Sequence, residues 1–367
     1  MINKRLSVVV VFLLFLTALC PAQESSNGSF GDGVMSVAPF GKPFWADMYS
    51  TTTWVEIAYA TNSPEYDYGE YNTNYRFFLF ANLGVDIPLW SGSYSNGKYG
   101  LSVTLPYMIE LWYDRFEWKT SPIVDTSYRF GVFDTTFIYR LDDPIQVFPR
   151  KETSSMPGFL HFDIYNWTIK LGLLKHESTH IGDELTIFLK DHDFPITRID
   201  VLRNYGEIIF TLNDPDSKMR VNHGFKFGFL FNYNYLYNNW YNVFETEADT
   251  DLVELSRIPF EIYLQYQYQS PPFSRGLQVI TSFEYRLRER HRYPFSYSGS
   301  MAGAYQDNPP DLVNCFNIYA GIRYDNQKPN YFSKIGFGIR YYFGLNPYGQ
   351  YRSMPYYRQI GLVAIFE

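Results

Sequence analysis

The sequence predicts an all-β protein, an antiparallel transmembrane β-barrel of about 12 strands within a range of roughly 10–14. Three observations carry this prediction. Apolar and polar residues alternate with a period of two in many segments. Aromatic residues make up 20% of the chain, although its mean hydropathy is only -0.25. The chain also begins with a pattern that is typical of exported proteins.

The leader has the three parts of a secretory signal. A basic start precedes an apolar run over 6–19, and Ala22 comes before polar sequence. The run is shorter than the ~20 apolar residues that a transmembrane helix needs. We therefore predict a signal peptide over 1–22 and a location in the bacterial outer membrane, with lipid attachment at Cys20 as the alternative.

The clearest alternation runs from Val221 to Tyr237. One face of this segment carries a series of aromatic residues, and the other carries mostly Asn, Gly and Lys. Such a series is unusual in a soluble sandwich but is expected on a strand that faces lipid. We therefore predict that four aromatic residues point outward from the barrel: Phe225, Phe227, Phe229 and Phe231.

Other segments with this pattern predict the remaining strands. We place strands near 74–89, 99–118, 127–140, 158–165, 167–180, 196–212, 219–237, 257–270, 276–289, 313–325, 331–343 and 357–366. The last strand ends at Phe366, and this ending resembles the signal read by the barrel-assembly machinery.

We predict an N-terminal arm over 23–50 and the barrel over 51–367. Because Thr52–Ala60 also looks like a strand, 51–73 stays open as a plug or an extra strand.

A change of phase interrupts the alternation near Tyr165. Phe162 and Ile164 share one parity, whereas Trp167 and the apolar residues after it share the other. A tight turn at Tyr165-Asn166 would divide the segment into two strands, and a β-bulge would leave it as one.

Charge and cysteine content exclude several classes of protein. The net charge of -7 argues against nucleic acid as a partner. The two cysteines are Cys20 and Cys315, and removal of the leader leaves one, so no internal disulfide is predicted. The sequence has no phosphate-binding loop, zinc pattern or dinucleotide fingerprint, so we predict no metal and no cofactor.

The densest group of polar residues follows the strand that starts at Trp167. It comprises His176, Ser178, His180, Gly182, Asp183 and Glu184. On a strand, the two histidines and the serine share one face. They could act as a base and a nucleophile, bind a metal or ligand, or form a hydrogen-bonded cluster that closes a turn at the rim.

Two resemblances bear on this group. His176-Glu177-Ser178 is similar to the His-x-Ser pair of outer-membrane lipid hydrolases, such as outer-membrane phospholipase A and the lipid A deacylases. That resemblance implies His176 as the base and Ser178 as the nucleophile, with Asp191 or Asp193 as a third residue.

The stretch more strongly resembles an uncharacterised bacterial outer-membrane family, a domain of unknown function with a His-x-Ser-x-His-x-Gly-Asp-Glu stretch. The runs Ala38-Pro39-Phe40 and Trp45-Ala46-Asp47 add to this second resemblance, which implies the barrel but no activity.

The parity of the strand argues against hydrolysis. His176 and Ser178 have the same parity as Lys170 and the opposite parity to Trp167. Unless a bulge intervenes, they therefore lie on the face opposite the apolar one. The pair would then face the lumen, away from lipid. The sequence therefore favours a structural, binding or transport role beside outer-membrane lipid, with lipid hydrolysis as the alternative and the oligomeric state open.

A row of charged residues lies on the polar face of the strand from 276: Glu284, Arg286 and Arg288. Guanidinium groups along a lumen could attract a small anionic solute, which makes an anion channel a further alternative. We favour a network of ion pairs with inward carboxylates such as Glu261, Glu110 and Asp114, because charges kept from water need partners.

Overall fold

The computed structural model describes residues 44–45, 47, 52–61, 65–68, 71–74, 77–95, 97–114, 123–147, 162–181, 199–213, 223–232, 241–242, 260–273, 276–289, 312–325, 334–345 and 357–366. All regular structure in these residues is β-strand. Within the same residues, no helix is long and apolar enough to cross a membrane. The predicted leader over 1–22 lies outside the described residues.

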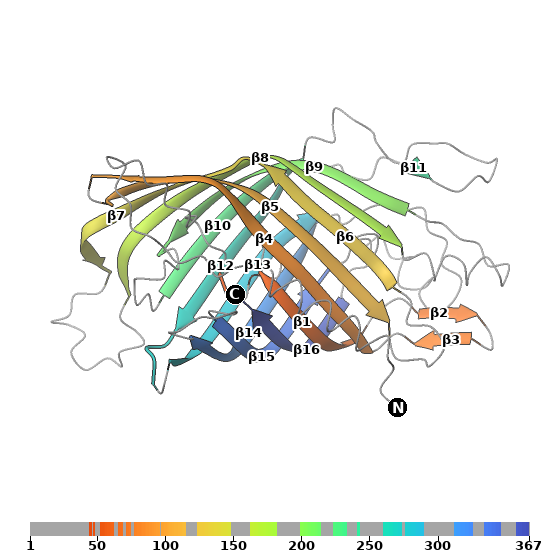
Figure 1. Cartoon of the computed structure of the whole chain (residues 1–367). Helices are drawn as coiled ribbons and strands as arrows, with labels where there is room; N and C mark the ends of the chain where they lie inside the picture. Colours follow the sequence, from red (N-terminus) through yellow and green to blue (C-terminus); the bar gives the residue numbers. More distant parts are fainter. Residues whose placement is uncertain are drawn as a thin grey trace.

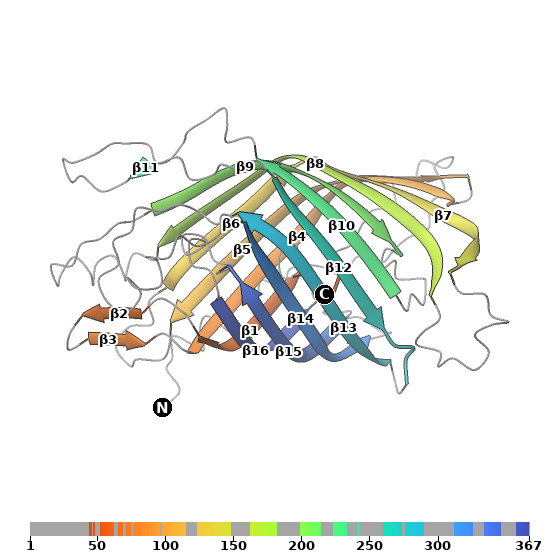
Figure 2. The same cartoon turned by 180° about the vertical axis from the view of Figure 1, so that it is seen from behind.

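Twelve antiparallel strand positions close into a barrel (Figures 1 and 2). Around the barrel they are β1 (Thr53–Thr61), β4 (Phe77–Tyr94), β5 (Tyr99–Asp114), β6 (Ile123–Val132) with β7 (Asp134–Gln146), β8 (Asp163–Ile181), β9 (Ile199–Leu212), β10 (His223–Asn232), β12 (Phe260–Gln269), β13 (Leu277–Glu289), β14 (Leu312–Asp325), β15 (Lys334–Gly344) and β16 (Tyr357–Phe366). β1 pairs with both β4 and β16, which closes the sheet. The predicted all-β barrel of about 12 strands is confirmed.

Three short strands lie outside this ring. β2 (Glu65–Tyr68) and β3 (Tyr71–Asn74) form a hairpin beside the barrel (Figures 1 and 2). β11 (Tyr241–Asn242) pairs with the first two residues of β9.

β6 and β7 share one position in the barrel because they lie end to end. β5 pairs with β7 over 99–104 and with β6 over 107–113, and β8 pairs with both strands on the other side. Phe133, between the two strands, has a φ of 58°. This left-handed backbone conformation is a local irregularity in a continuing strand, a β-bulge.

The strand number agrees with the prediction although two assignments change. The segments 158–165 and 167–180 were expected as separate strands, but the described part forms one strand, β8. A tight turn at Tyr165-Asn166 is therefore wrong, and the irregularity lies opposite, between Arg140 and Ile145 of β7. The segment left open as a plug or an extra strand supplies the additional barrel strand β1.

The outer face of the barrel is apolar and its inner face is polar. On β10, Phe225 and Phe227 are 45% and 44% exposed, whereas Lys226 between them is 6% exposed. Phe229 and Phe231 continue the outer face, so the predicted direction of these four residues is confirmed. Buried inward charges include Glu56, Arg129, Asp134, Glu177, Lys226, Arg286 and Arg340. Barrels that span a membrane have this arrangement.

Three residues ahead of β1 lie inside the barrel: Phe44, Trp45 and Asp47. Lys226 of β10 lies over the Phe44 ring, and its Nζ is 2.8 Å from Asp47 Oδ2. A Cβ at Gly336 of β15 would come within 2.7 Å of the Trp45 ring, so this glycine leaves room for the indole. The described part of the predicted arm is thus packed within the lumen.

Candidate active site on the outer face of the barrel

β8 carries a β-bulge two residues ahead of His176. Against β9, Gly172 pairs with Glu207 and Lys175 pairs with Tyr205, so β8 has one residue more than β9 over this interval. Leu173 and Leu174 both point outward as a result, at 51% and 61% exposure. The extra residue reverses the alternation, so that the next residue, Lys175, is inward and His176 is outward.

The expectation that His176 and Ser178 face the lumen is therefore wrong, and the bulge is the physical reason. His176 packs on the outer face against Phe130 of β6, with 4.9 Å between ring centroids. The ladder with β9 continues without interruption from Lys175 to Thr179, so Ser178 occupies the same strand face as His176. The side chains of Ser178 and His180 lie outside the described ones.

Asn204 of β9 is the partner of His176. The two residues are directly opposite in the ladder, and His176 Nδ1 is 2.8 Å from Asn204 Oδ1. An amide oxygen only accepts hydrogen bonds, so Nδ1 carries the proton and donates it to Oδ1. In the neutral imidazole with this tautomer, Nε2 has a free lone pair, which is the form of histidine that can act as a base.

These three positions together have the elements of a nucleophilic hydrolase. An amide fixes the tautomer of a histidine, and a serine lies two residues further along the same face of the strand. Serine becomes a useful nucleophile when a base of this kind removes its proton during attack. The chemistry that the arrangement can perform is therefore acyl transfer from an ester to serine and then to water.

Several residues predicted for the site fall outside the described residues: Gly182, Asp183, Glu184, Asp191 and Asp193. The sequence did not point to Asn204, whose side chain forms the hydrogen bond with His176. One signal was available, because Asn204 shares its parity with Ile208 and Phe210 on the apolar face of β9. Among the described residues, no group of His, Cys, Asp and Glu is arranged to hold a metal ion.

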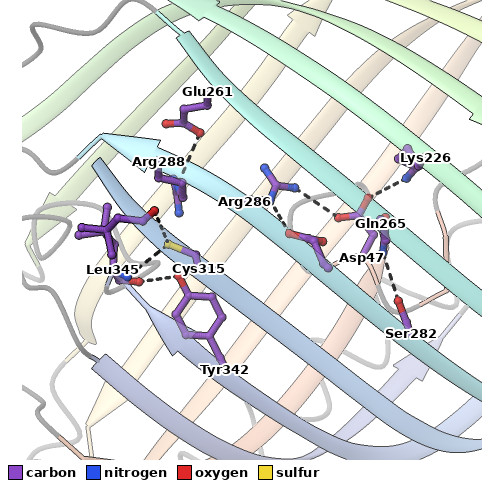
Figure 3. Close-up of polar contacts among 12 residues, drawn as sticks. Asp47, Lys226, Glu261, Gln265, Ser282, Arg286, Arg288, Cys315, Tyr342 and Leu345 are labelled. Carbon is purple, nitrogen blue, oxygen red and sulfur yellow. Dashed lines mark hydrogen bonds and ion pairs between the residues drawn. The ribbon is translucent and has the colours of Figure 1, made fainter. Parts of the chain in front are cut away.

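The charged row on β13 lies on the inner face of the barrel, and Figure 3 shows Arg286 and Arg288 beside carboxylate groups. Arg286 forms an ion pair with Glu284 and lies 3.9 Å from Asp47. Arg288 Nε is 3.5 Å from Glu261 Oε2. Both guanidinium groups thus lie against carboxylates. Two other carboxylates were predicted for this network. Glu110 instead pairs with Arg129, with 3.2 Å between Glu110 Oε2 and Arg129 Nη2, and the Asp114 side chain lies outside the described ones.

Replacement of Lys226 by Met is expected to destabilise the barrel by about 3 kcal/mol, because the buried Asp47 loses the ammonium group 2.8 Å away. Urea unfolding of the protein in lipid vesicles would measure this. The matched control is Lys98→Met, which removes an ion pair with the exposed Asp142 and should leave the unfolding midpoint nearly unchanged. Equal midpoints for the two variants would contradict the anchoring of Asp47 by Lys226.

Solved structures with a similar fold are outer-membrane proteins. Outer membrane phospholipase A from Escherichia coli aligns with a TM-score of 0.42 and 11% identity, over 90% of this chain and 95% of that chain. A calcium-bound dimer of the phospholipase from Salmonella typhi gives 0.41 and 12% identity, over 86% and 90% of the two chains. The NanC porin gives 0.35 and 9% identity, over 86% and 99%. Likenesses at this level assign no activity to this chain.

The sequence comparisons add no assignment. No family model matches the chain, and no curated protein matches it. The resemblance to an uncharacterised outer-membrane family therefore stays a prediction.

Proposed function

We propose that this chain is an outer-membrane hydrolase that cleaves acyl esters of membrane lipids. Ser178 is the nucleophile, His176 is the general base and Asn204 orients the imidazole. The observation that carries the proposal is the hydrogen bond between His176 and Asn204 on the outer wall, in unbroken register with Ser178.

The surroundings of the pair favour a lipid as the substrate. His176 and Asn204 lie on a wall that carries many exposed apolar residues nearby: Phe130, Leu171, Leu173, Leu174, Ile208 and Phe210. Polar side chains that face hydrocarbon are costly and are therefore a sign of function. A site on this wall meets molecules that are dissolved in the membrane.

The depth of His176 fits the depth of lipid ester groups. The rings of Trp167, Tyr139 and Tyr99 pack against one another near the tight turn between β4 and β5, as in an aromatic girdle. His176 is nine positions beyond Trp167 on β8. At about 3.3 Å per residue and a tilt of about 40°, this places it roughly 23 Å higher, close to the full height of the apolar band. Lipid esters lie at that boundary.

The reaction follows from the roles of the three residues. The Ser178 hydroxyl oxygen attacks the ester carbonyl carbon while His176 Nε2 takes the hydroxyl proton. The carbon–oxygen bond to the lipid alcohol then breaks, and the imidazolium returns the proton to the leaving oxygen. Water, deprotonated by the same nitrogen, releases the fatty acid from Ser178. Throughout, Asn204 Oδ1 accepts the hydrogen bond from Nδ1–H and holds the ring in place.

The interior gives less support to an anion channel. Arg286 and Arg288 lie against carboxylates, and Phe44, Trp45 and Asp47 occupy space within the lumen. Paired and buried guanidinium groups attract a solute anion more weakly than free ones, because their charge is neutralised locally.

The proposal is tested first at Asn204. Asn204→Ala is expected to lower kcat by about 100-fold or more, because the imidazole loses its preferred tautomer and orientation. Asn204→Asp keeps an oxygen acceptor and should retain more activity than the alanine variant. Release of fatty acid from phospholipid in mixed detergent micelles would measure both.

A matched control lies on β14, four strand positions away from β9 around the barrel. Asn314 of β14 also points outward and accepts a hydrogen bond of 2.8 Å from the hydroxyl of Tyr285. Asn314→Ala should leave hydrolysis unchanged. The proposal fails if the wild-type protein releases no fatty acid, or if the Asn204→Ala and Asn314→Ala variants have equal activity.

A further inference from the structure

A cluster of buried charges lies on the inner face directly behind the candidate site. Asp134 of β7 is fully buried, and its Oδ2 atom is 3.0 Å from both Lys170 Nζ and Lys175 Nζ. Lys175 also forms an ion pair with Glu207 of β9. The cluster therefore joins three neighbouring strands, two of which carry the candidate residues His176 and Asn204.

The cluster also joins two bulges. Asp134 directly follows Phe133, whose φ is 58°, and Lys175 directly follows the pair Leu173 and Leu174. Gly172 leaves space for this contact, because a Cβ there would overlap the Lys175 side chain and come within 2.7 Å of Asp134 Oδ1. The ion pair between Asp134 and Lys175 thus lies between the two bulges.

We propose that Asp134, Lys175 and Glu207 form a clamp that keeps the bulge in β8 and thereby holds His176 and Ser178 on the membrane face. This inference rests on the proposed function. The three charged residues are positioning residues, since they lie on the inner face and act through the backbone of β8.

The physical argument compares two registers of the outer part of β8. If the bulge were lost by a slip of one residue, Lys175 would point to lipid and His176 to the lumen. A lysine that faces hydrocarbon is costly, whereas Lys175 in the present register has two carboxylate partners. The charges therefore favour the register in which the candidate base is accessible to lipid.

A second ion pair supports the same register. Glu177, between His176 and Ser178, is buried on the inner face, and its Oε1 is 3.2 Å from Arg129 Nε of β6. Arg129 Nη2 is also 3.2 Å from Glu110 of β5. The residue between the proposed base and nucleophile is thus anchored inside the barrel as well.

The test compares two buried carboxylates that differ in place. Asp134→Asn weakens the clamp. Glu56→Gln weakens a different ion pair, between Glu56 of β1 and Arg340 of β15, in which Arg340 Nη1 is 2.7 Å from Glu56 Oε2. Both acids are fully buried on the inner face, so the substitutions are comparable. Glu207→Gln serves as a milder variant if Asp134→Asn does not fold, because Lys175 then keeps Asp134.

Two readouts separate positioning from general destabilisation. Fatty acid release gives kcat and KM, and a spin label at Leu174→Cys, in a Cys315→Ser background, reports exposure to oxygen dissolved in lipid. A label at Leu171→Cys, outward in both registers, is the reference. We expect Asp134→Asn to lower kcat at least tenfold with little change in KM, and to lower the oxygen accessibility of the label at 174 severalfold. Glu56→Gln should change neither.

Each outcome decides between the two claims. Equal accessibility of the label at 174 in the Asp134→Asn and Glu56→Gln variants would overturn the clamp, and so would a loss of accessibility without a loss of kcat. A wild-type protein without hydrolytic activity would contradict the proposed function, but the spin label would still test the clamp because its signal does not depend on catalysis. In that case, a loss of accessibility in Asp134→Asn would still support the clamp as the device that fixes the register.

Discussion

Ser178→Ala is expected to abolish lipid hydrolysis, with a fall in kcat of about 10⁴-fold or more, because the nucleophile that forms the acyl intermediate is removed. His176→Ala should have an effect of similar size, since a serine without its base is a poor nucleophile. The double variant should be little worse than either single variant, because the two residues act as one unit. Fatty acid release from phospholipid micelles, with pure refolded protein, measures all three.

A hydroxyl elsewhere on the same wall provides the control for this series. Thr135 of β7 is on the outer face, and its hydroxyl donates a hydrogen bond of 3.3 Å to the carbonyl oxygen of Phe133. Thr135→Val should keep full activity. If Ser178→Ala hydrolysed lipid as fast as this control, the group around His176 would return to the structural role that the sequence alone favoured.

Insertion of one alanine between Lys175 and His176 is expected to remove all measurable hydrolysis. The insertion moves every later residue of β8 by one position, which turns His176 and Ser178 into the lumen and Glu177 toward lipid. Deletion of Leu174 is the converse change, because it removes the extra residue of the bulge and leaves His176 outward. The deletion variant should therefore keep most of its activity.

The two length variants check each other, since both alter β8 within three residues of the site. Heat-modifiable migration on gels would show that each still forms a barrel. An active insertion variant, or a folded but inactive deletion variant, would contradict the role that we assign to the bulge.

The barrel was predictable because alternation reports directly on burial. The four phenylalanines of β10 show why, since lipid on one side and polar side chains on the other leave a period of two in the sequence. The segment Thr53–Thr61 has the same pattern, but it was not assigned with certainty because its closing partner, β16, lies at the far end of the chain.

The predicted direction of the site, toward the lumen, was wrong because one bulge reverses every later residue. Leu173 and Leu174 fit an outer wall in either register, so they carry no signal by themselves. Lys175 and Glu177 do carry a signal, because they have the same parity as the apolar residues before them. In a strand without a bulge, either the two charges would face lipid or those apolar residues would face the lumen. Asn204 was missed because the alternation within β9 does not tell which residue of β8 lies opposite it.

The central claim is that Ser178 is a serine activated by His176 on the membrane face. Its most direct test is covalent labelling with a long-chain fluorophosphonate, which reacts with activated serines, in membranes that contain the folded protein. Mass spectrometry should find the adduct on Ser178 in the wild-type protein and lose it in His176→Ala. Folded protein without an adduct on Ser178, or an adduct of equal yield in His176→Ala, would contradict the claim.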